Sequence, residues 1–384
     1  MIMAYFFWFL VLALFYTYAL YPLLLLLFSA LTPRKTLPAI DQQPDVTLIV
    51  TAYNEEAVIS KKLENCLALA YPGEKLEIIV VSDGSSDRTD ELVGEFAHRG
   101  VTLLKTGGRI GKTGAQNEAA RQGQGEILVF SDANSLWEQD ALNCLVAPFQ
   151  DPGVGYACGQ LKYTNTREGA SSFSEGLYWR YEIFLRRLES ATGAITAGNG
   201  AIYAIRSSDY FNFNSNQSHD FEFPRFLSLM SKKAVYIHTA VAWEKAGATT
   251  ADEYKRKVRM LARVWGSVLK APPVKPRAVS GRLGFTWKYI SHRLLRYLAP
   301  FFLVLVFVLN VFLYSQGPLY QIPFLVQISF YSLALIGAVH RIKAKIFYIP
   351  FYFCLFHLAC IRGLVQASLN RAPAIWEKAG STRT

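Results

Sequence analysis

The chain has 384 residues, of which 52% are hydrophobic and 18% are charged, and its formal net charge at pH 7 is +11. This is more apolar than a typical soluble enzyme, and the positive charge suits an anionic partner or a membrane surface. The five cysteines include no CxxC pair, which argues against a disulfide framework and a zinc site and favours reduced thiols in the cytosol.

An uncharged segment comes first in the chain. No charged side chain occurs between Met1 and Pro33, and about 20 apolar residues are enough to cross the hydrocarbon core of a bilayer. The segment lacks the basic start and the short apolar core of a signal peptide. Residues 1–33 are therefore predicted to be a retained transmembrane anchor. Arg34 and Lys35, directly after it, favour a cytoplasmic C-terminal end.

A soluble region of about residues 38–288 follows, and its first half alternates between strand and helix patterns. Continuous apolar strands separated by helices predict an α/β fold with a mostly parallel sheet that is covered on both faces. Such sheets bind ligands at the carboxyl ends of their strands. The predicted strands are Val46–Tyr53, Leu76–Ser82, Val101–Lys105 and Glu126–Ser131, and the predicted helices are Glu55–Ala70, Arg88–Arg99 and Thr113–Gln122.

The C-terminal region, residues 297–365, is again apolar. No formal charge occurs between Arg296 and Arg341, and the SQGP turn divides this run into two predicted helices, about Leu298–Tyr314 and Ile322–Val339. Basic residues on both sides of the run favour a hairpin with both ends in the cytoplasm.

A third apolar stretch, Ile346–Ile361, has only 16 residues between charges and is short for a span. If it crosses the membrane, the basic tail at residues 366–384 lies outside, against the charge rule. If it is re-entrant or interfacial, the tail stays inside. The sequence leaves both alternatives open.

Polar motifs stand at the ends of the predicted strands. TAYNEE ends the first, DGSSD follows the second, GRIGKTGAQN lies between the third and the fourth, and SDAN ends the fourth. No GxGxxG follows the first strand and no GxxxxGK[ST] occurs, which argues against a Rossmann dinucleotide site and a P-loop. Asp132 and Asn134 flank one small residue, and their oxygens suit a hard cation, Mg²⁺ or Mn²⁺, shared with phosphates.

These motifs, in this order and spacing, resemble the inverting family 2 glycosyltransferases with a GT-A fold. The resemblance covers about residues 46–270, and the flanking helices and the segment YFCLFHLACIRG…IWEKAGSTR are similar to membrane-integrated bacterial members. It implies a nucleotide-sugar half over residues 46–135 and an acceptor half with an interfacial helix over residues 136–288.

The resemblance also implies roles on the donor side. Ala52, Tyr53 and Glu55 would line the nucleoside site, Asp83 would contact the base, most often uracil, and Lys112 would lie near the nucleotide. Asp132 and Asn134 match the DxD pair that holds the donor diphosphate and the metal. Because the second position of that pair is an asparagine here, the metal would meet one negative charge less.

On the acceptor side, HDF resembles the motif that carries the family's general base, which implies that role for Asp220. Inversion needs a carboxylate that removes the proton of the acceptor hydroxyl as the hydroxyl attacks. His219 stands where many relatives have Asp or Glu, and Glu222 is a rival base. Asp220 could instead cap the helix that follows, as Asp83 could cap a turn.

The basic segment Lys255–Trp265 predicts a helix that departs from the QxxRW motif of processive relatives, with Met260 and Val264 at its Gln and Trp positions. Arg259 and Arg263 share one helix face and could meet the diphosphate, together with Trp265; a membrane-facing basic helix is the alternative. Gly198 and Asn199 form a turn that could be the floor of the acceptor site.

The sequence thus predicts a multi-pass enzyme of the inner (plasma) membrane with its catalytic domain in the cytoplasm. It would transfer a sugar from a UDP-sugar to a glycan or a lipid-linked acceptor. One version extends a cell-surface polysaccharide, with a homo-oligomer or an export partner; the other adds a single sugar to a polyprenyl carrier. Asn134 and His219 also suit an inactive regulator that only binds a nucleotide sugar. A nucleotidyltransferase would leave the helices and Asp220 unused, and no nucleic acid is expected as a partner.

Overall fold

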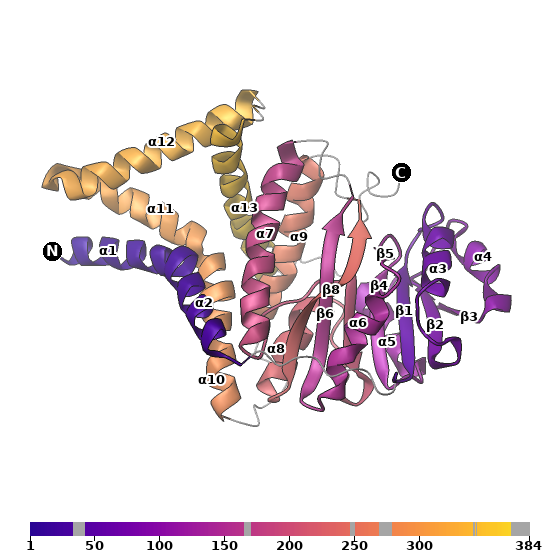
Figure 1. Ribbon diagram of the computed structural model, residues 1–384. Coiled ribbons are helices and arrows are strands. Elements are labelled where there is room, and N and C mark those ends of the chain that lie inside the picture. The colour runs from indigo at the N-terminus through magenta and orange to yellow at the C-terminus, as the bar shows by residue number, and fades with distance from the viewer. Residues whose placement is uncertain are drawn as a thin grey trace.

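The structure is a computed structural model that describes residues 1–33, 43–164, 170–245, 250–268, 279–340, 342 and 344–369. The molecule has two parts, a mixed β-sheet layered with helices and a set of long apolar helices beside it (Figure 1). Arg34, Lys35, Arg341 and the basic tail after residue 369, on which the expected topology depends, lie outside the described residues.

The sheet has eight strands in the order β3-β2-β1-β4-β7-β6-β8-β5. The first four in this order are parallel neighbours, as predicted. β7 runs antiparallel to β4 and β6, β6 and β8 are parallel to each other, and β5 is antiparallel to β8. The strands are β1 Val46–Ala52, β2 Leu76–Ser82, β3 Val101–Lys105, β4 Ile127–Asp132, β5 Leu136–Trp137, β6 Val154–Tyr163, β7 Ile202–Arg206 and β8 Lys233–Glu244.

The carboxyl ends of the parallel strands lie level with one another. Ala52 at the end of β1 is opposite Ser82 on β2, and Thr51 is opposite Asp132 on β4. Because β7 is antiparallel to β4, its first residue Ile202 lies opposite Ser131 at this same edge. The four polar motifs and the turn before β7 therefore meet at one edge of the sheet.

Alternate residues of the buried strands point into two separate hydrophobic layers. Leu48 and Val50 of β1 pack with helices α3, α4 and α6, while Ile49 packs with α5 and α8 on the other face. The helices of this part are α3 Ile59–Leu67, α4 Thr89–Gly94, α5 Lys112–Gln122, α6 Ala141–Val146, α7 Ala170–Ala191, α8 His219–Leu229 and α9 Thr250–Val268, with short 3-10 turns at Gly73–Lys75, Ala97–Arg99, Ala147–Gln150 and Ser207–Asp209.

Two predicted helices are shorter than expected. The helix predicted from Glu55 begins at Ile59, because Asn54 adopts a left-handed φ of 51° and its N–H bonds to Ser85 at 3.1 Å, which keeps the chain out of the helix. The helix predicted to Arg99 ends at Gly94. Helix α9 covers the predicted basic segment.

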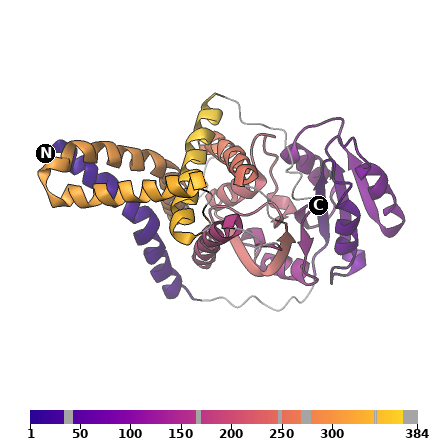
Figure 2. The same ribbon diagram turned by 90° about the horizontal axis from the view of Figure 1, so that it is seen from above.

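The long apolar helices frame both ends of the chain. They are α1 Ile2–Phe15, the π-helical turn η1 Tyr16–Leu20, α2 Tyr21–Leu31, α10 Val279–Lys288, the π-helical turn η6 Tyr289–Leu294, α11 Leu295–Leu313, the 3-10 turn η7 Tyr314–Gln316, α12 Pro318–His340 and α13 Lys345–Ser368. Within the described part of the chain, four helical segments are long and apolar enough to cross a membrane: Ile2–Leu31, Leu283–Gln316, Pro318–His340 and Lys345–Ser368. α11 and α12 form the predicted hairpin, and α1 lies beside α11 (Figures 1 and 2).

Helix α13 packs against α12 of this bundle and also along α9 of the sheet-containing part. The indole N–H of Trp265 donates to the carbonyl of Cys360 at 3.2 Å. A Cβ on Gly363 would come within 2.9 Å of the Cβ of Leu261, so only glycine allows this close approach. The third apolar stretch is therefore part of a 24-residue helix, longer than its 16 uncharged residues indicated.

Candidate functional site

The loops that follow β1 and β2 are hydrogen-bonded to each other. The N–H of Glu55 donates to the Thr89 hydroxyl at 2.7 Å, and this hydroxyl donates to the Asp87 carboxylate at 2.5 Å. The N–H of Asn54 donates to the Ser85 hydroxyl. The small polar residues of DGSSD thus set the shape of the TAYNEE loop, in which Glu55 is fully buried.

Asp83 holds the glycine-rich loop against the end of β2. Its side chain is buried and accepts the N–H of Ile110 at 2.8 Å and the N–H of Gly111 at 3.1 Å, while its own N–H donates to the carbonyl of Ala52 at 2.9 Å. The end of β1, the end of β2 and the loop before α5 are therefore tied together at this residue. The expected contact between Asp83 and a base stays a prediction.

Arg109 and Tyr53 form a stacked pair beside Asp83. The Arg109 guanidinium lies 3.7 Å from the centre of the Tyr53 ring, a close cation–π contact. Gly84, with φ 68°, allows it, because a Cβ there would lie 3.1 Å from the backbone nitrogen of Arg109. No role for Arg109 was predicted from the sequence. The pair presents a flat, half-buried surface of the kind on which a nucleobase stacks.

Lys112 and Asp132 form an ion pair where α5 begins and β4 ends, and both side chains are 19% exposed. Gly200 lies against them, since a Cβ at Gly200 would be 3.0 Å from the Lys112 ammonium and 3.8 Å from Asp132. The ammonium and the N-terminus of α5 make this corner suited to phosphate groups.

The residues at the end of β4 suit a divalent metal that is shared with a ligand. Among the described residues, no group of three His, Cys, Asp or Glu side chains could hold a metal ion. Asp132 and the half-buried Asn134 supply oxygen atoms, which Mg²⁺ and Mn²⁺ prefer, and leave positions for phosphate oxygens and water. The donor set therefore fits an ion held jointly by two side chains and a diphosphate.

The turn at Gly198–Gly200 joins this corner to Asp220. The N–H of Gly198 donates to the carbonyl of Asp220 at 2.7 Å, and Ser218 hydrogen-bonds to the Asp220 carboxylate in the first turn of α8. A Cβ at Gly198 would lie 2.0 Å from the Tyr156 hydroxyl, so the turn rests directly on that ring. The predicted donor-side and acceptor-side residues, which are far apart in the sequence, thus meet at one turn.

Asn199 shapes this turn from within. Its amide donates to the carbonyl of Gly159 at 2.7 Å, and its side-chain oxygen accepts the N–H groups of Ala201 and Ile202, each at 3.1 Å. These bonds use both the amide nitrogen and the amide oxygen of the side chain. The presence of an asparagine at this position is therefore explained by the turn itself and does not require a bound ligand.

Of the acidic and basic candidates at the start of α8, Asp220 is the accessible one. His219 is buried, bonds to the Tyr203 hydroxyl at 3.0 Å, and burial lowers its pKa to about 3, so its ring is neutral. Glu222 is buried too and lies 3.4 Å from Arg225. Asp220 is half-buried, so a substrate can reach its carboxylate more readily than that of Glu222.

Helix α9 contributes Arg263 to the surroundings of Asp220. Burial lowers the pKa of Arg263, and the Asp220 carboxylate acts to raise it. The two charges are therefore within electrostatic range of each other. Arg259, four residues earlier, is also half-buried. Trp265 packs against α13 through its bond to Cys360, and its predicted role on the acceptor side stays a prediction.

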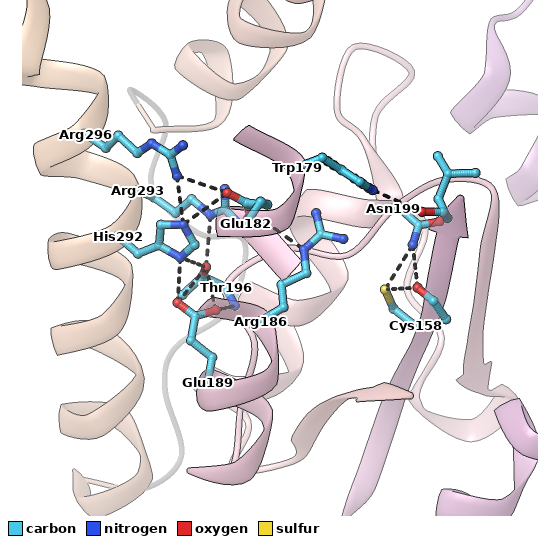
Figure 3. A network of polar contacts seen from close by, with 12 residues as sticks. Cys158, Trp179, Glu182, Arg186, Glu189, Thr196, Asn199, His292, Arg293 and Arg296 are labelled. Atoms are coloured by element: carbon cyan, nitrogen blue, oxygen red, sulfur yellow. Dashed lines mark hydrogen bonds and ion pairs between the residues drawn. The ribbon is translucent and has the colours of Figure 1, made fainter. Parts of the chain in front are cut away.

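A cluster of buried charges, which sequence reasoning missed, connects α7 to the helices at the membrane side (Figure 3). We call it the junction cluster; its members are Glu182, Arg186, Glu189, Thr196, Lys288, His292, Arg293 and Arg296. Glu182 pairs with Arg293 at 2.6 Å and with Arg296 at 3.0 Å. Glu189 accepts the N–H of Thr196 at 2.9 Å. The cluster therefore anchors the segment between α7 and the Gly198–Gly200 turn.

Electrostatics within the junction cluster favour ionised carboxylates. Burial alone would raise the pKa of Glu182, but Arg293, His292 and Arg296 outweigh it and hold that pKa well below its usual range. The one signal in the sequence was the spacing of Glu182 and Glu189, seven residues apart on one face of an amphipathic helix.

Comparison with known proteins identifies related sequences. Residues 47–213 match the model of the family described as Glycosyl transferase family 2. The chain is 32% identical over 172 residues to the beta-monoglucosyldiacylglycerol synthase of Synechocystis sp., which covers 43% of this chain and 36% of that protein. It is 26% identical over 226 residues to the poly-beta-1,6-N-acetyl-D-glucosamine synthase of Staphylococcus aureus, which covers 57% and 54%. The matches span about a third to a half of these curated relatives.

A solved structure matches nearly the whole chain. The mannosyltransferase PcManGT from Pyrobaculum calidifontis, in complex with GDP-Man and Mn²⁺, superposes with a TM-score of 0.71 over 94% of this chain and 99% of that one, at 23% sequence identity. At this identity the likeness concerns the fold. It confirms the predicted fold class, a mostly parallel α/β sheet with apolar helices near both termini.

Proposed function

We propose, for a chain whose residues 47–213 belong to glycosyl transferase family 2, that it transfers a sugar from a nucleotide-diphosphate sugar to an acceptor at the membrane. The observation that carries the proposal is the meeting of two groups at the Gly198–Gly200 turn. Lys112 and Asp132 lie against Gly200, and Asp220 is bonded to Gly198. A donor diphosphate and an acceptor hydroxyl held by these groups would be neighbours.

The donor nucleoside would lie on the surface formed by Tyr53 and Arg109, above the loop held by Asp83. The resemblance of the motifs favours a UDP-sugar, whereas the mannosyltransferase that shares the fold was solved with GDP-Man. The diphosphate would reach Lys112 at the N-terminus of α5. Stacking and charge of this kind are tolerant of base identity, so the donor must be identified by assay.

Asp132 and Asn134 would hold Mg²⁺ or Mn²⁺ together with the donor diphosphate. The bound ion would neutralise charge that develops on the leaving diphosphate. Lys112 adds a permanent positive charge at the same corner, and the half-buried setting of the Lys112–Asp132 pair strengthens its field relative to bulk water.

Asp220 would act as the general base of an inverting transfer. Its carboxylate takes the proton of the acceptor hydroxyl while the hydroxyl oxygen forms a bond to the anomeric carbon. The bond from that carbon to the diphosphate breaks on the opposite face, and the nucleoside diphosphate leaves with the electron pair. Arg263 lies within electrostatic range of Asp220 and would hold the carboxylate in position beside the acceptor.

The membrane would hold the bundle of α1, α11 and α12, whose outer surfaces expose large apolar side chains such as Phe9, Val308 and Val326. For α13 we propose an interfacial position along α9. The buried Lys257 of α9 lies over the ring of Tyr352 of α13, at 5.4 Å, which suits a helix at the membrane surface better than one in hydrocarbon. This position keeps the tail and the catalytic domain on the cytoplasmic side of the inner membrane.

The acceptor would be a glycan or a lipid-linked saccharide. The curated relatives include a polysaccharide synthase and a synthase of a glycosylated diacylglycerol, so both versions of the function have precedents. A polymer product would further call for a homo-oligomer or an export partner. Product length on a gel separates extension of a polymer from addition of one sugar.

The test is nucleotide release from the full-length protein in detergent, with Mg²⁺ or Mn²⁺, a panel of UDP- and GDP-sugars and membrane extract as the source of acceptor. We expect release from one donor, a product with inverted anomeric configuration by NMR, and loss of release in Asp132→Ala. Nucleotide binding without release from any donor would contradict the proposal and favour the inactive regulator.

A further inference from the structure

The junction cluster contains more positive than negative charge. Among its described members, Arg186, Arg293, Arg296 and Lys288 carry four positive charges, while Glu182 and Glu189 carry two negative ones. Even without His292, the four cations exceed the two buried carboxylates of the cluster by two. All of these side chains are buried, where an uncompensated charge is costly. An anion that binds here would restore the balance.

Arg186 is the member of the cluster that has a buried hydrogen-bond donor without an acceptor among the described residues. Its side chain is 6% exposed, and its Nε has no hydrogen-bond partner among the described residues. The nearest carboxylate oxygen, on Glu182, is 3.8 Å away and already accepts a bond from Arg293. Because a guanidinium does not lose its proton in proteins, Arg186 stays charged and retains donors for a ligand.

The guanidinium of Arg186 points from α7 toward the turn that carries Asn199, not toward His292 (Figure 3). It lies 5.2 Å from the ring of Trp179. The Tyr156 hydroxyl, on which the Gly198 backbone rests, is likewise buried and has no partner among the described residues. Arg186 therefore points toward the turn whose Gly198 is bonded to Asp220.

Arg186 and Asp220 both act electrostatically on the buried thiol of Cys158. Burial raises the pKa of Cys158 to about 11; Arg186 acts to lower it, and Asp220 acts to raise it further. Both charges are thus within electrostatic range of one buried atom, which is itself 3.4 Å from the Asn199 amide. An anion bound by Arg186 would lie close to the carboxylate that would accept the proton.

We infer that the acceptor is a phosphate-bearing lipid whose phosphate binds Arg186 while a hydroxyl of its attached sugar faces Asp220. This rests on the proposed function and names its substrate class. A phosphate matches the planar fork of a guanidinium, and its negative charge opposes the positive excess of the junction cluster. The cluster joins α7 to η6 and α11, and Glu189 also bonds to Tyr21 of α2, so the cluster lies next to the apolar helices that would meet the lipid.

The experiment measures binding to the full-length protein in detergent micelles, with farnesyl phosphate, farnesol and inorganic phosphate as probes. The variants are Arg186→Gln, Arg186→Lys and the matched control Arg180→Gln, which removes an exposed arginine of the same helix. Binding of UDP and GDP in the presence of Mn²⁺ is measured in parallel for each variant. It tests whether the donor side is intact and thus separates a failure of this inference from a failure of the proposed function.

We expect wild type and Arg180→Gln to bind farnesyl phosphate at least tenfold more tightly than farnesol, and Arg186→Gln to lose this difference while it still binds nucleotide. Arg186→Lys should retain part of it, because it keeps the charge and loses the fork. If inorganic phosphate binds as tightly as farnesyl phosphate, the site is for a free anion and the lipid assignment is wrong. Equal binding of farnesol and farnesyl phosphate by wild type, or an unchanged difference in Arg186→Gln, would overturn the inference.

A second variant tests the inference if Arg186→Gln does not fold. Glu182→Gln removes the carboxylate charge that lies 3.8 Å from Arg186 and leaves the guanidinium in place, so it should tighten farnesyl phosphate binding relative to farnesol. A purely structural role of the cluster would instead leave the ratio of the two affinities unchanged.

Discussion

The backbone N–H of Gly198 donates a 2.7 Å hydrogen bond to the carbonyl of Asp220, so the turn before β7 and the first turn of α8 are fixed to each other. The same turn brings Gly200 against Lys112 and Asp132. One short backbone segment therefore sets the distance between the predicted base and the predicted diphosphate corner. The position of Asp220 relative to Lys112 and Asp132 should therefore depend on this turn.

Gly198→Ala should disrupt this arrangement. The added Cβ would lie 2.0 Å from the Tyr156 hydroxyl and 2.9 Å from its ring carbon, so the turn must shift. We expect a loss of about 10²-fold in kcat and of about 1–3 kcal/mol in stability, measured by nucleotide release and thermal unfolding. Gly266→Ala on α9, where a Cβ meets nothing within 4 Å, should lower neither. Wild-type activity of Gly198→Ala would contradict the role of the turn.

Asn134→Asp should strengthen metal binding at the end of β4. The change adds a second carboxylate to that of Asp132, and hard cations bind more tightly as the ligand charge rises. The Mn²⁺ concentration for half-maximal activity should fall on the order of tenfold. A rise in this concentration would show that Asn134 does not face the metal. Asp140→Asn, at an exposed position, serves as a control for a changed surface charge.

His219 should make the protein sensitive to mild acid. Its pKa is about 3 when folded, against 6.5 as the ordinary value, so below pH 6.5 the unfolded chain binds a proton that the folded one excludes. The stability is full above pH 6.5 and falls as the pH drops, by about 2 kcal/mol at pH 5. Thermal unfolding between pH 7.5 and 5 measures this. His219→Asn should flatten the dependence and retain activity; loss of turnover with intact folding would assign His219 a catalytic role instead.

Glu189→Gln should weaken the link between the membrane helices and the turn. The change removes a buried carboxylate charge from the contacts with His292 and Thr196, and removing one charge of a buried ion pair typically costs about 3–5 kcal/mol. We expect a large fall in the apparent Tm. Glu95→Gln, at an exposed position, should leave the Tm unchanged. Equal Tm values for both variants would mean that the junction cluster does not stabilise the fold.

The parallel half of the sheet was predictable because each of its strands is a continuous apolar run between helix patterns. β2 and β3 match their predicted bounds, and β1 and β4 differ by one residue at their ends. β6 and β7 were not predicted, since they follow no alternation with helices and β6 contains Gly155 and Gly159. Their mixed directions depend on long-range pairing that local patterns do not contain.

The candidate site was predictable where a motif ends a strand. The strand register brings Asp132 level with Thr51, as expected for carboxyl ends of parallel strands. The stacking of Arg109 on Tyr53 depends on the path of a glycine-rich loop, and the junction cluster joins residues about 110 positions apart, such as Glu182 and Arg293. No periodicity in a single sequence indicates such contacts.

The most direct test of the central claim compares nucleotide release and nucleotide binding in Asp220→Asn and in Asp140→Asn. If Asp220 is the base, its variant should bind UDP or GDP with Mn²⁺ as wild type does, while sugar transfer falls about 10²–10⁴-fold. Asp140→Asn should match wild type in both measurements. Turnover by Asp220→Asn close to that of wild type would contradict the account.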